Sequence, residues 1–132
     1  MTELKRIVLV EDDEDIATLA TMALQDLGGF DVVHFPSGEA AIEGLAEANP
    51  DLVILDYSMP GINGDQVLKR MRATPELACI PVVFLTASVM PSHVAKLKDL
   101  GAIDVFKKPF DPLVLSDRIR SVWDMRGQPA QF

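Results

Sequence analysis

The sequence predicts an α/β fold in which a five-stranded parallel sheet is doubly wound, with helices on both faces. Short β-branched runs alternate along the chain with segments whose apolar residues recur at helical spacing, and the runs themselves are almost continuously apolar. Such runs are typical of parallel strands buried on both faces, and right-handed crossovers should connect them. At 132 residues with 48% hydrophobic content, the chain fits a single core.

The expected strands are five short runs rich in β-branched and aromatic residues, bounded by turn formers. They cover residues 6–10, 31–35, 52–55, 82–86 and 104–107. Helical patterns fill the intervals between them, so the chain reads as five βα units.

The first expected helix follows the first strand and ends at the C-cap pair Gly28-Gly29. Asp13 or Glu14 should contribute to its N-terminus, where negative charge is favoured. Its apolar stripe comprises Ile16, Leu19, Ala20, Ala23, Leu24 and Leu27. The opposite side should be exposed, and it carries Asp15, Thr18 and Met22.

Four more helices are expected from capping residues and apolar spacing. Ser37 and Asn63 can cap the second and third helices, Pro91 opens the fourth, which Gly101 closes, and Pro112 opens the fifth. Their inward residues are Ala41, Leu45 and Ala48; Val67, Leu68 and Met71; Val94, Leu97 and Leu100; and Leu115, Ile119, Val122 and Trp123. We expect one domain over residues 1–126 and a short tail over residues 127–132.

Charge and cysteine content restrict the partners and the compartment. The net charge of −8 would repel nucleic acid and anionic membranes, so direct binding to either is not expected. Cys79 has no second cysteine to pair with, which favours a reducing cytoplasm. The N-terminus shows no signal-peptide pattern, and no apolar run approaches membrane-spanning length.

Carboxylates follow two of the expected strands. Glu11-Asp12-Asp13 come directly after the first strand, and Asp56 comes directly after the third. If the two strands are neighbours, these side chains converge at the carboxyl edge of the sheet, where open α/β folds place their ligand sites. Because an uncompensated buried charge costs several kcal/mol, the convergence favours a bound cation. Mg²⁺ prefers oxygen ligands and needs only one or two carboxylates.

A hydroxyl and an ammonium are expected at the same edge. Thr86 ends the fourth strand and Lys108 follows the fifth, whereas Lys107 should point to the other face. A carboxylate nucleophile, a divalent cation, a lysine and a hydroxyl together are typical of phosphoryl transfer. His34 and His93 have no neighbouring ligand residue, and we interpret both as structural.

These residues resemble the receiver domain of two-component response regulators, which has a flavodoxin-like (βα)5 fold. The resemblance covers nearly the whole chain, and the ordered set of motifs is highly specific. The motifs are Val10-Glu11-Asp12-Asp13, Leu55-Asp56-Tyr57-Ser58-Met59-Pro60-Gly61, Leu85-Thr86-Ala87 and Lys108-Pro109-Phe110.

The resemblance implies a role for each position. Asp56 would be the phosphoacceptor, and it would hold Mg²⁺ or Mn²⁺ together with Glu11, Asp12 and the main-chain carbonyl of Ser58. Lys108 would pair with the phosphate.

Further roles follow from the same resemblance. Thr86 would hydrogen-bond the phosphate once it has formed, and Ala87 would leave it accessible. The bond between Lys108 and Pro109 would be cis. The chain departs from the family at Val105, where receivers commonly carry a Tyr or Phe ring that moves inward on phosphorylation, so that ring cannot act here.

Each position also has a purely structural interpretation. Asp56 could be a solvated strand end, and Glu11 and Asp12 an acidic turn that caps a helix. Thr86 could be an ordinary strand residue and Lys108 a solvated lysine. A phosphatase with an aspartyl nucleophile is a rival, but it would need a second Asp where Ser58 stands.

Two binding modules are further rivals. A flavin mononucleotide (FMN) binder of the same fold needs a Ser-, Thr- or Gly-rich loop where residues 11–15 are all acidic. A receiver-like interaction module would lack one of the motif residues, and a receiver fragment of a larger regulator is the remaining alternative.

We therefore expect a stand-alone receiver, a monomer or weak dimer, that a histidine kinase or histidine phosphotransfer protein phosphorylates. It would also catalyse its own phosphorylation and dephosphorylation, without being a metabolic enzyme. The exposed side of the first helix would meet the phosphodonor. The expected output surface, made by the fourth helix, fifth strand and fifth helix, includes Lys96, Asp99, Val105 and Lys107.

Overall fold

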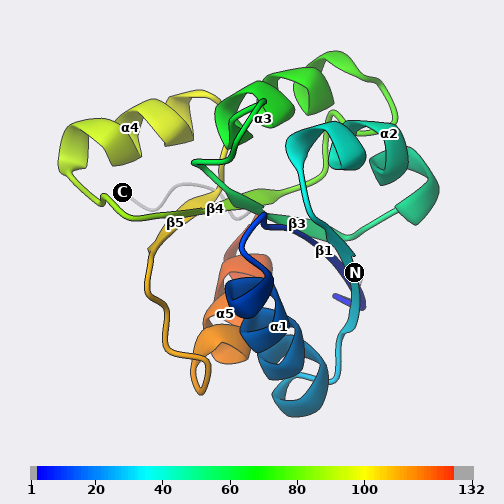
Figure 1. Ribbon diagram of the computed structural model, residues 1–132, viewed down its shortest axis with the longest axis vertical. Coiled ribbons are helices and arrows are strands. Elements are labelled where there is room, and N and C mark those ends of the chain that lie inside the picture. The colour runs from blue at the N-terminus through cyan, green and yellow to red at the C-terminus, as the bar shows by residue number, and fades with distance from the viewer. Residues whose placement is uncertain (1–2, 127–132) are drawn as a thin grey trace.

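Five parallel strands form one sheet in the computed structural model, in the order β2-β1-β3-β4-β5 (Figure 1). The structure describes residues 3–126, so the predicted tail over residues 127–132 lies outside it. Every neighbouring pair of strands is parallel, and helices connect the strands along the chain. The predicted doubly wound fold is confirmed.

The elements follow the predicted alternation closely. The strands are β1 (Arg6–Val10), β2 (Asp31–Phe35), β3 (Leu52–Asp56), β4 (Val82–Thr86) and β5 (Asp104–Lys107). The helices are α1 (Glu14–Met22), the π-helix η1 (Ala23–Leu27), α2 (Gly38–Ala48), α3 (Gly64–Ala73), α4 (Pro91–Asp99) and α5 (Leu115–Met125). The third strand is one residue longer than predicted and includes Asp56.

The sheet separates two hydrophobic cores. Figure 1 shows α1 and α5 on one side of the sheet and α2, α3 and α4 on the other. Side chains alternate along β1, so Ile7 and Leu9 enter the core under α1 and α5, whereas Val8 and Val10 enter the other core. Burying each such side chain contributes roughly 1.5–3 kcal/mol, and β3 and β4 are buried along their whole length.

The predicted helix caps are formed at the first two helices. Asp13 is the N-cap of α1, and its carboxylate accepts hydrogen bonds from the amides of Asp15 and Ile16 at 2.9 and 3.1 Å. Ser37 caps α2 by accepting from the amide of Ala40. These caps satisfy amides that have no partner within the helix, which fixes where each helix begins.

The first helix differs from its prediction because it changes to a π-helix at Ala23. Leu19 and Leu27 are 45% and 58% exposed, although the apolar spacing predicts both in the buried stripe. Leu19 lies beside the stripe rather than in it, and the wider π turns rotate Leu27 away from the core. The hydroxyl of Ser116 on α5 donates to the carbonyl of Ala23, which ties the π-helix to its neighbour.

Two further predictions need correction. Helix α5 begins at Leu115 rather than at Pro112, because the amide of Val114 donates to the carbonyl of Asp111 and residues 112–114 form a turn. We expect Val105 on the output surface, but it is only 8% exposed, since it points into the core that α4 covers. Within residues 3–126, no helix is both long and apolar enough to cross a bilayer.

Candidate functional site

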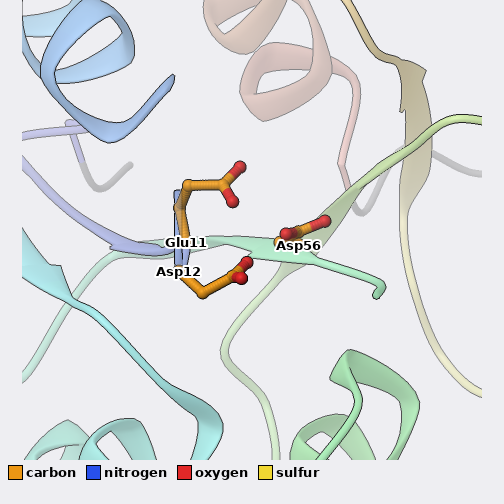
Figure 2. Close-up of side chains that lie close together, drawn as sticks. All are labelled: Glu11, Asp12 and Asp56. Carbon is orange, nitrogen blue, oxygen red and sulfur yellow. The ribbon is translucent and has the colours of Figure 1, made fainter. Parts of the chain in front are cut away.

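The acidic residues meet because β1 and β3 are neighbours in register. Val10 pairs with Leu55, so Glu11 and Asp56 follow side by side at the carboxyl edge of the sheet. Strand β1 lies where the strand order reverses, which is the position of ligand sites in open α/β sheets. Figure 2 shows the carboxylates of Glu11 and Asp12 gathered beside that of Asp56, with ligand atoms of all three within 4.8 Å of one another.

Lys108 completes this cluster from the carboxyl end of β5, the edge strand of the sheet. Its ammonium lies 3.1 Å from Glu11 Oε1 and 3.2 Å from Asp56 Oδ1. It follows β5 directly, and its peptide bond to Pro109 is cis, as expected. Lys107 is exposed, as strand alternation predicts. Although burial disfavours the charged ammonium, its hydrogen bond with Glu11 and the charges of both carboxylates raise the pKa of Lys108.

Asp56 has a strongly perturbed acidity. Burial raises the pKa of Asp56 from 3.8 to about 7, and the close approach and negative charge of Glu11 act in the same direction. Lys108 opposes the rise but does not cancel it. Asp56 and Glu11 are 2% and 0% exposed, so water screens their repulsion poorly. A proton therefore competes for Asp56 near neutral pH.

Unsatisfied oxygen atoms indicate what the cluster can bind. Asp56 Oδ2 is buried and accepts no hydrogen bond within the described residues, and Glu11 Oε1 has only its ion pair with Lys108. Asp12, by contrast, is exposed. A buried carboxylate oxygen without a partner costs about 1–3 kcal/mol or more, and a hard cation with oxygen ligands would offset that cost. The donor set therefore fits Mg²⁺ or Mn²⁺.

The loop after β3 is held close to Asp56 by Gly64. The amide of Gly64 donates to the carbonyl of Tyr57 at 2.8 Å. The amide of Tyr57 in turn donates to the carbonyl of Leu85 at 2.9 Å. A methyl group at Gly64 would collide with the carbonyl oxygen of Asp56. Ser58 is exposed in this loop, two residues after Asp56. The start of α3 thus fixes the path of the segment that would supply the Ser58 carbonyl.

Thr86 is buried at the end of β4, but its hydroxyl contacts α4 rather than Asp56 among the residues described. Thr86 Oγ1 lies 3.2 Å from His93 Nε2 and accepts a hydrogen bond from the amide of Ser88 at 3.3 Å. The rings of His93 and Tyr57 are in edge contact, with centroids 4.8 Å apart. Thr86 therefore lies at the edge of the site in contact with His93, a residue that the sequence did not assign to the site.

Both histidines contact site residues, which the sequence did not predict. His34 Nε2 lies 2.8 Å from the carbonyl oxygen of Glu11, and His93 contacts Thr86. The pairing of β1 with β2 could have placed His34 near the site, since His34 lies opposite Leu9, near the end of β1. His93 gave no such signal, because the path of the loop between β4 and α4 decides where the first turn of α4 lies.

Comparison with known proteins identifies one family. A family model described as the response regulator receiver domain matches residues 7–120. Over 117 residues the chain is 37% identical to the DNA-binding response regulator MtrA of Mycobacterium tuberculosis, covering 89% of this chain and 50% of that protein. It is 34% identical to the phosphate regulon transcriptional regulatory protein PhoB of Rhizobium meliloti, over 90% of this chain and 52% of PhoB. The chain thus spans about half the length of these relatives.

Solved structures give the same result. The chemotaxis protein CheY4 of Vibrio cholerae superposes with a TM-score of 0.84 at 27% identity, over 91% of this chain and 99% of CheY4. The BeF3-activated N-terminal receiver domain of Klebsiella pneumoniae RstA gives a TM-score of 0.77 at 34% identity, over 89% of this chain and 97% of that domain.

Proposed function

The chain belongs to the response regulator receiver domain family, and we propose on that premise that Asp56 is its phosphoacceptor. The proposal rests above all on Asp56 Oδ2, a buried carboxylate oxygen without a hydrogen-bond partner among the described residues, in a cluster with a lysine and two further carboxylates. The donor is a histidine kinase or a histidine phosphotransfer protein.

In the transfer, a carboxylate oxygen of Asp56 attacks the phosphorus of a phosphohistidine. The new oxygen–phosphorus bond forms as the nitrogen–phosphorus bond breaks, and the donor imidazole leaves with the electron pair. Lys108 already contacts Asp56, so its ammonium pairs with a phosphoryl oxygen after a short movement. The Thr86 hydroxyl then donates to another phosphoryl oxygen. Hydrolysis of the acyl phosphate by water resets the domain.

Glu11, Asp12, Asp56 and the main-chain carbonyl of Ser58 would hold Mg²⁺ or Mn²⁺. When bound, the cation neutralises negative charge on the carboxylates and on the transferred group. Asp12 is the exposed carboxylate among these ligands and gives the site its access to solvent.

Asp15, Thr18 and Met22 are exposed on α1, the helix that follows β1 and its acidic residues along the chain, and this surface is where the phosphodonor docks. The output passes through a change of the surface near α4 to a partner. The phosphatase alternative lacks support, because Ser58 stands where its general acid or base would be required.

Substituting Asp56→Asn tests the phosphoacceptor directly. The change is nearly isosteric but removes the nucleophilic carboxylate, so incorporation from radiolabelled acetyl phosphate or from a phosphorylated kinase should fall to background. The incorporated label should be sensitive to hydroxylamine, as an acyl phosphate is. Asp26→Asn, an exposed site on the π-helix, is the matched control and should incorporate normally. Label retained by Asp56→Asn at the wild-type rate would disprove the assignment.

A further inference from the structure

His93 contacts two residues at the candidate site. Its imidazole touches the hydroxyl of Thr86 at 3.2 Å and the ring of Tyr57, the residue directly after Asp56. It stands in the first turn of α4, the helix that follows β4 and Thr86 along the chain. A contact to Thr86 and a contact to the loop after β3 therefore converge on one side chain.

The burial of Thr86 favours its hydroxyl as the donor in the hydrogen bond with His93. Thr86 is only 5% exposed, so its hydroxyl proton needs an acceptor in the protein. The amide of Ser88 donates to Thr86 Oγ1 but cannot accept the hydroxyl proton, whereas His93 Nε2 lies within hydrogen-bond distance as an acceptor. A neutral His93 that carries its proton on Nδ1 satisfies this arrangement. The single hydroxyl proton then cannot be donated to a phosphoryl oxygen and to His93 at the same time.

Helix α4 is anchored to the sheet by fewer buried residues than its neighbour α3. Within the described residues it buries Leu97 alone, whereas α3 and α5 each bury four residues. Its N-cap residue, Met90, makes no side-chain capping bond. Val105, below α4, is small and stiff at χ1, so no aromatic side chain of β5 occupies this place. The ring beside Thr86 comes instead from α4 itself.

We propose that His93 is a positioning residue that holds the Thr86 hydroxyl on α4 until Asp56 is phosphorylated. Thr86 then turns to the phosphoryl group, the bond to His93 is lost, and the first turn of α4 is released from the sheet. This inference rests on the proposed function, since it takes phosphorylation of Asp56 as the trigger.

The first test uses the wild-type protein and beryllofluoride with Mg²⁺ as the phosphoryl mimic. The ring ¹⁵N signals of His93 are recorded with and without the mimic, and in Thr86→Val. The Nε2 signal should shift on binding of the mimic, and Thr86→Val alone should shift it in the same direction. Binding of the mimic with an unchanged His93 ring would overturn this inference alone. Failure of the wild type to bind the mimic would overturn the proposed function as well.

The second test measures the affinity for beryllofluoride. His93→Phe keeps a ring against Tyr57 but removes the acceptor, so Thr86 no longer gives up a bond to reach the mimic. Because a hydrogen bond contributes a net 0.5–1.5 kcal/mol, the affinity should rise about 2- to 10-fold. The same substitution should have no effect in a Thr86→Val background.

Two further variants separate this role from a structural one. His93→Gln retains a side-chain acceptor and should restore the wild-type affinity. Ser92→Ala removes a neighbouring exposed hydroxyl and should change nothing. An affinity that is unchanged or weakened in His93→Phe, or a gain that persists without the Thr86 hydroxyl, would overturn the inference.

Discussion

Two buried carboxylates, at the ends of neighbouring strands, determine the acidity of the site. Asp56 and Glu11 share one lysine, and together they carry more negative charge than Lys108 can balance. Without a cation, the pKa of Asp56 rises to about 7, primarily because of burial. Burial disfavours the ionised form of Asp56 in the metal-free protein. A bound cation that replaces the proton would stabilise that ionised form.

This elevated pKa leads to a pH-dependent stability in metal-free solution. In the unfolded chain Asp56 ionises near its ordinary value of 3.8, whereas the folded protein keeps the proton up to about pH 7. The folded state therefore binds more protons between these values, and the stabilisation is lost as the pH rises through 7. Since each pKa unit corresponds to about 1.4 kcal/mol, the loss is at most about 4 kcal/mol.

Urea unfolding in the presence of a chelator measures the effect when wild type is compared with Asp56→Asn. From about pH 5 to about pH 8, the wild type should lose free energy of unfolding relative to the variant, which has no proton to lose at this position. Millimolar Mg²⁺ should reduce the difference at about pH 8. Parallel pH profiles for the two proteins in chelator would show that the pKa of Asp56 is not elevated.

At the scale of elements, the sequence predicted what depends on local chemistry and on burial. Apolar runs predict the strands, and a capping preference predicts Ser37. The preference for negative charge at a helix N-terminus predicts Asp13 or Glu14 at the first helix, and the structure selects Asp13. The change to a π-helix at Ala23 was not predictable, because it depends on contacts with α5 that include the bond from Ser116. The site carboxylates were predictable because parallel strands end at one edge. The contact of His93 with Thr86 was not, because a loop conformation sets it.

Gly64 shows how an element boundary shapes the site. Its backbone φ is ordinary, and what requires glycine is the close approach to the carbonyl oxygen of Asp56 and to the ring of Phe84. Gly64→Ala should therefore cost roughly 1–3 kcal/mol of stability through overpacking, and it should also weaken Mg²⁺ binding by displacing the loop that contains Ser58.

Gly29→Ala provides the comparison for this prediction. Gly29 has a left-handed φ of +72° and no atom near the added methyl group. The substitution should cost roughly 1–2 kcal/mol through backbone strain alone, and leave Mg²⁺ affinity unchanged. Thermal unfolding and Mg²⁺ titration of both variants separate the two effects. Equal Mg²⁺ affinity in Gly64→Ala and wild type would show that the start of α3 does not position the site.

For the whole molecule, the charge balance determines how the fold responds to a cation. The chain carries a net charge of −8, and three of its carboxylates lie within 4.8 Å at one end of the sheet. Two carboxylates about 4 Å apart repel by roughly 1 kcal/mol at the dielectric constant of water and about 4 kcal/mol at an effective value of 20. Folding therefore works against this repulsion, and a cation bound only by the folded state relieves it.

Mg²⁺ should accordingly raise the melting temperature of the unmodified protein. Binding to the native state adds RT ln(1 + [L]/Kd) to the free energy of unfolding, so the temperature should climb with millimolar Mg²⁺. Asp12→Ala should show a smaller rise, and because Asp12 is exposed the variant should still fold. Asp15→Ala removes one negative charge on α1 outside the cluster, so it controls for general screening and should respond as the wild type does. Because screening would act on all three proteins alike, an equal rise in each would mean that Mg²⁺ acts on the net charge and not on a site built from Glu11, Asp12 and Asp56.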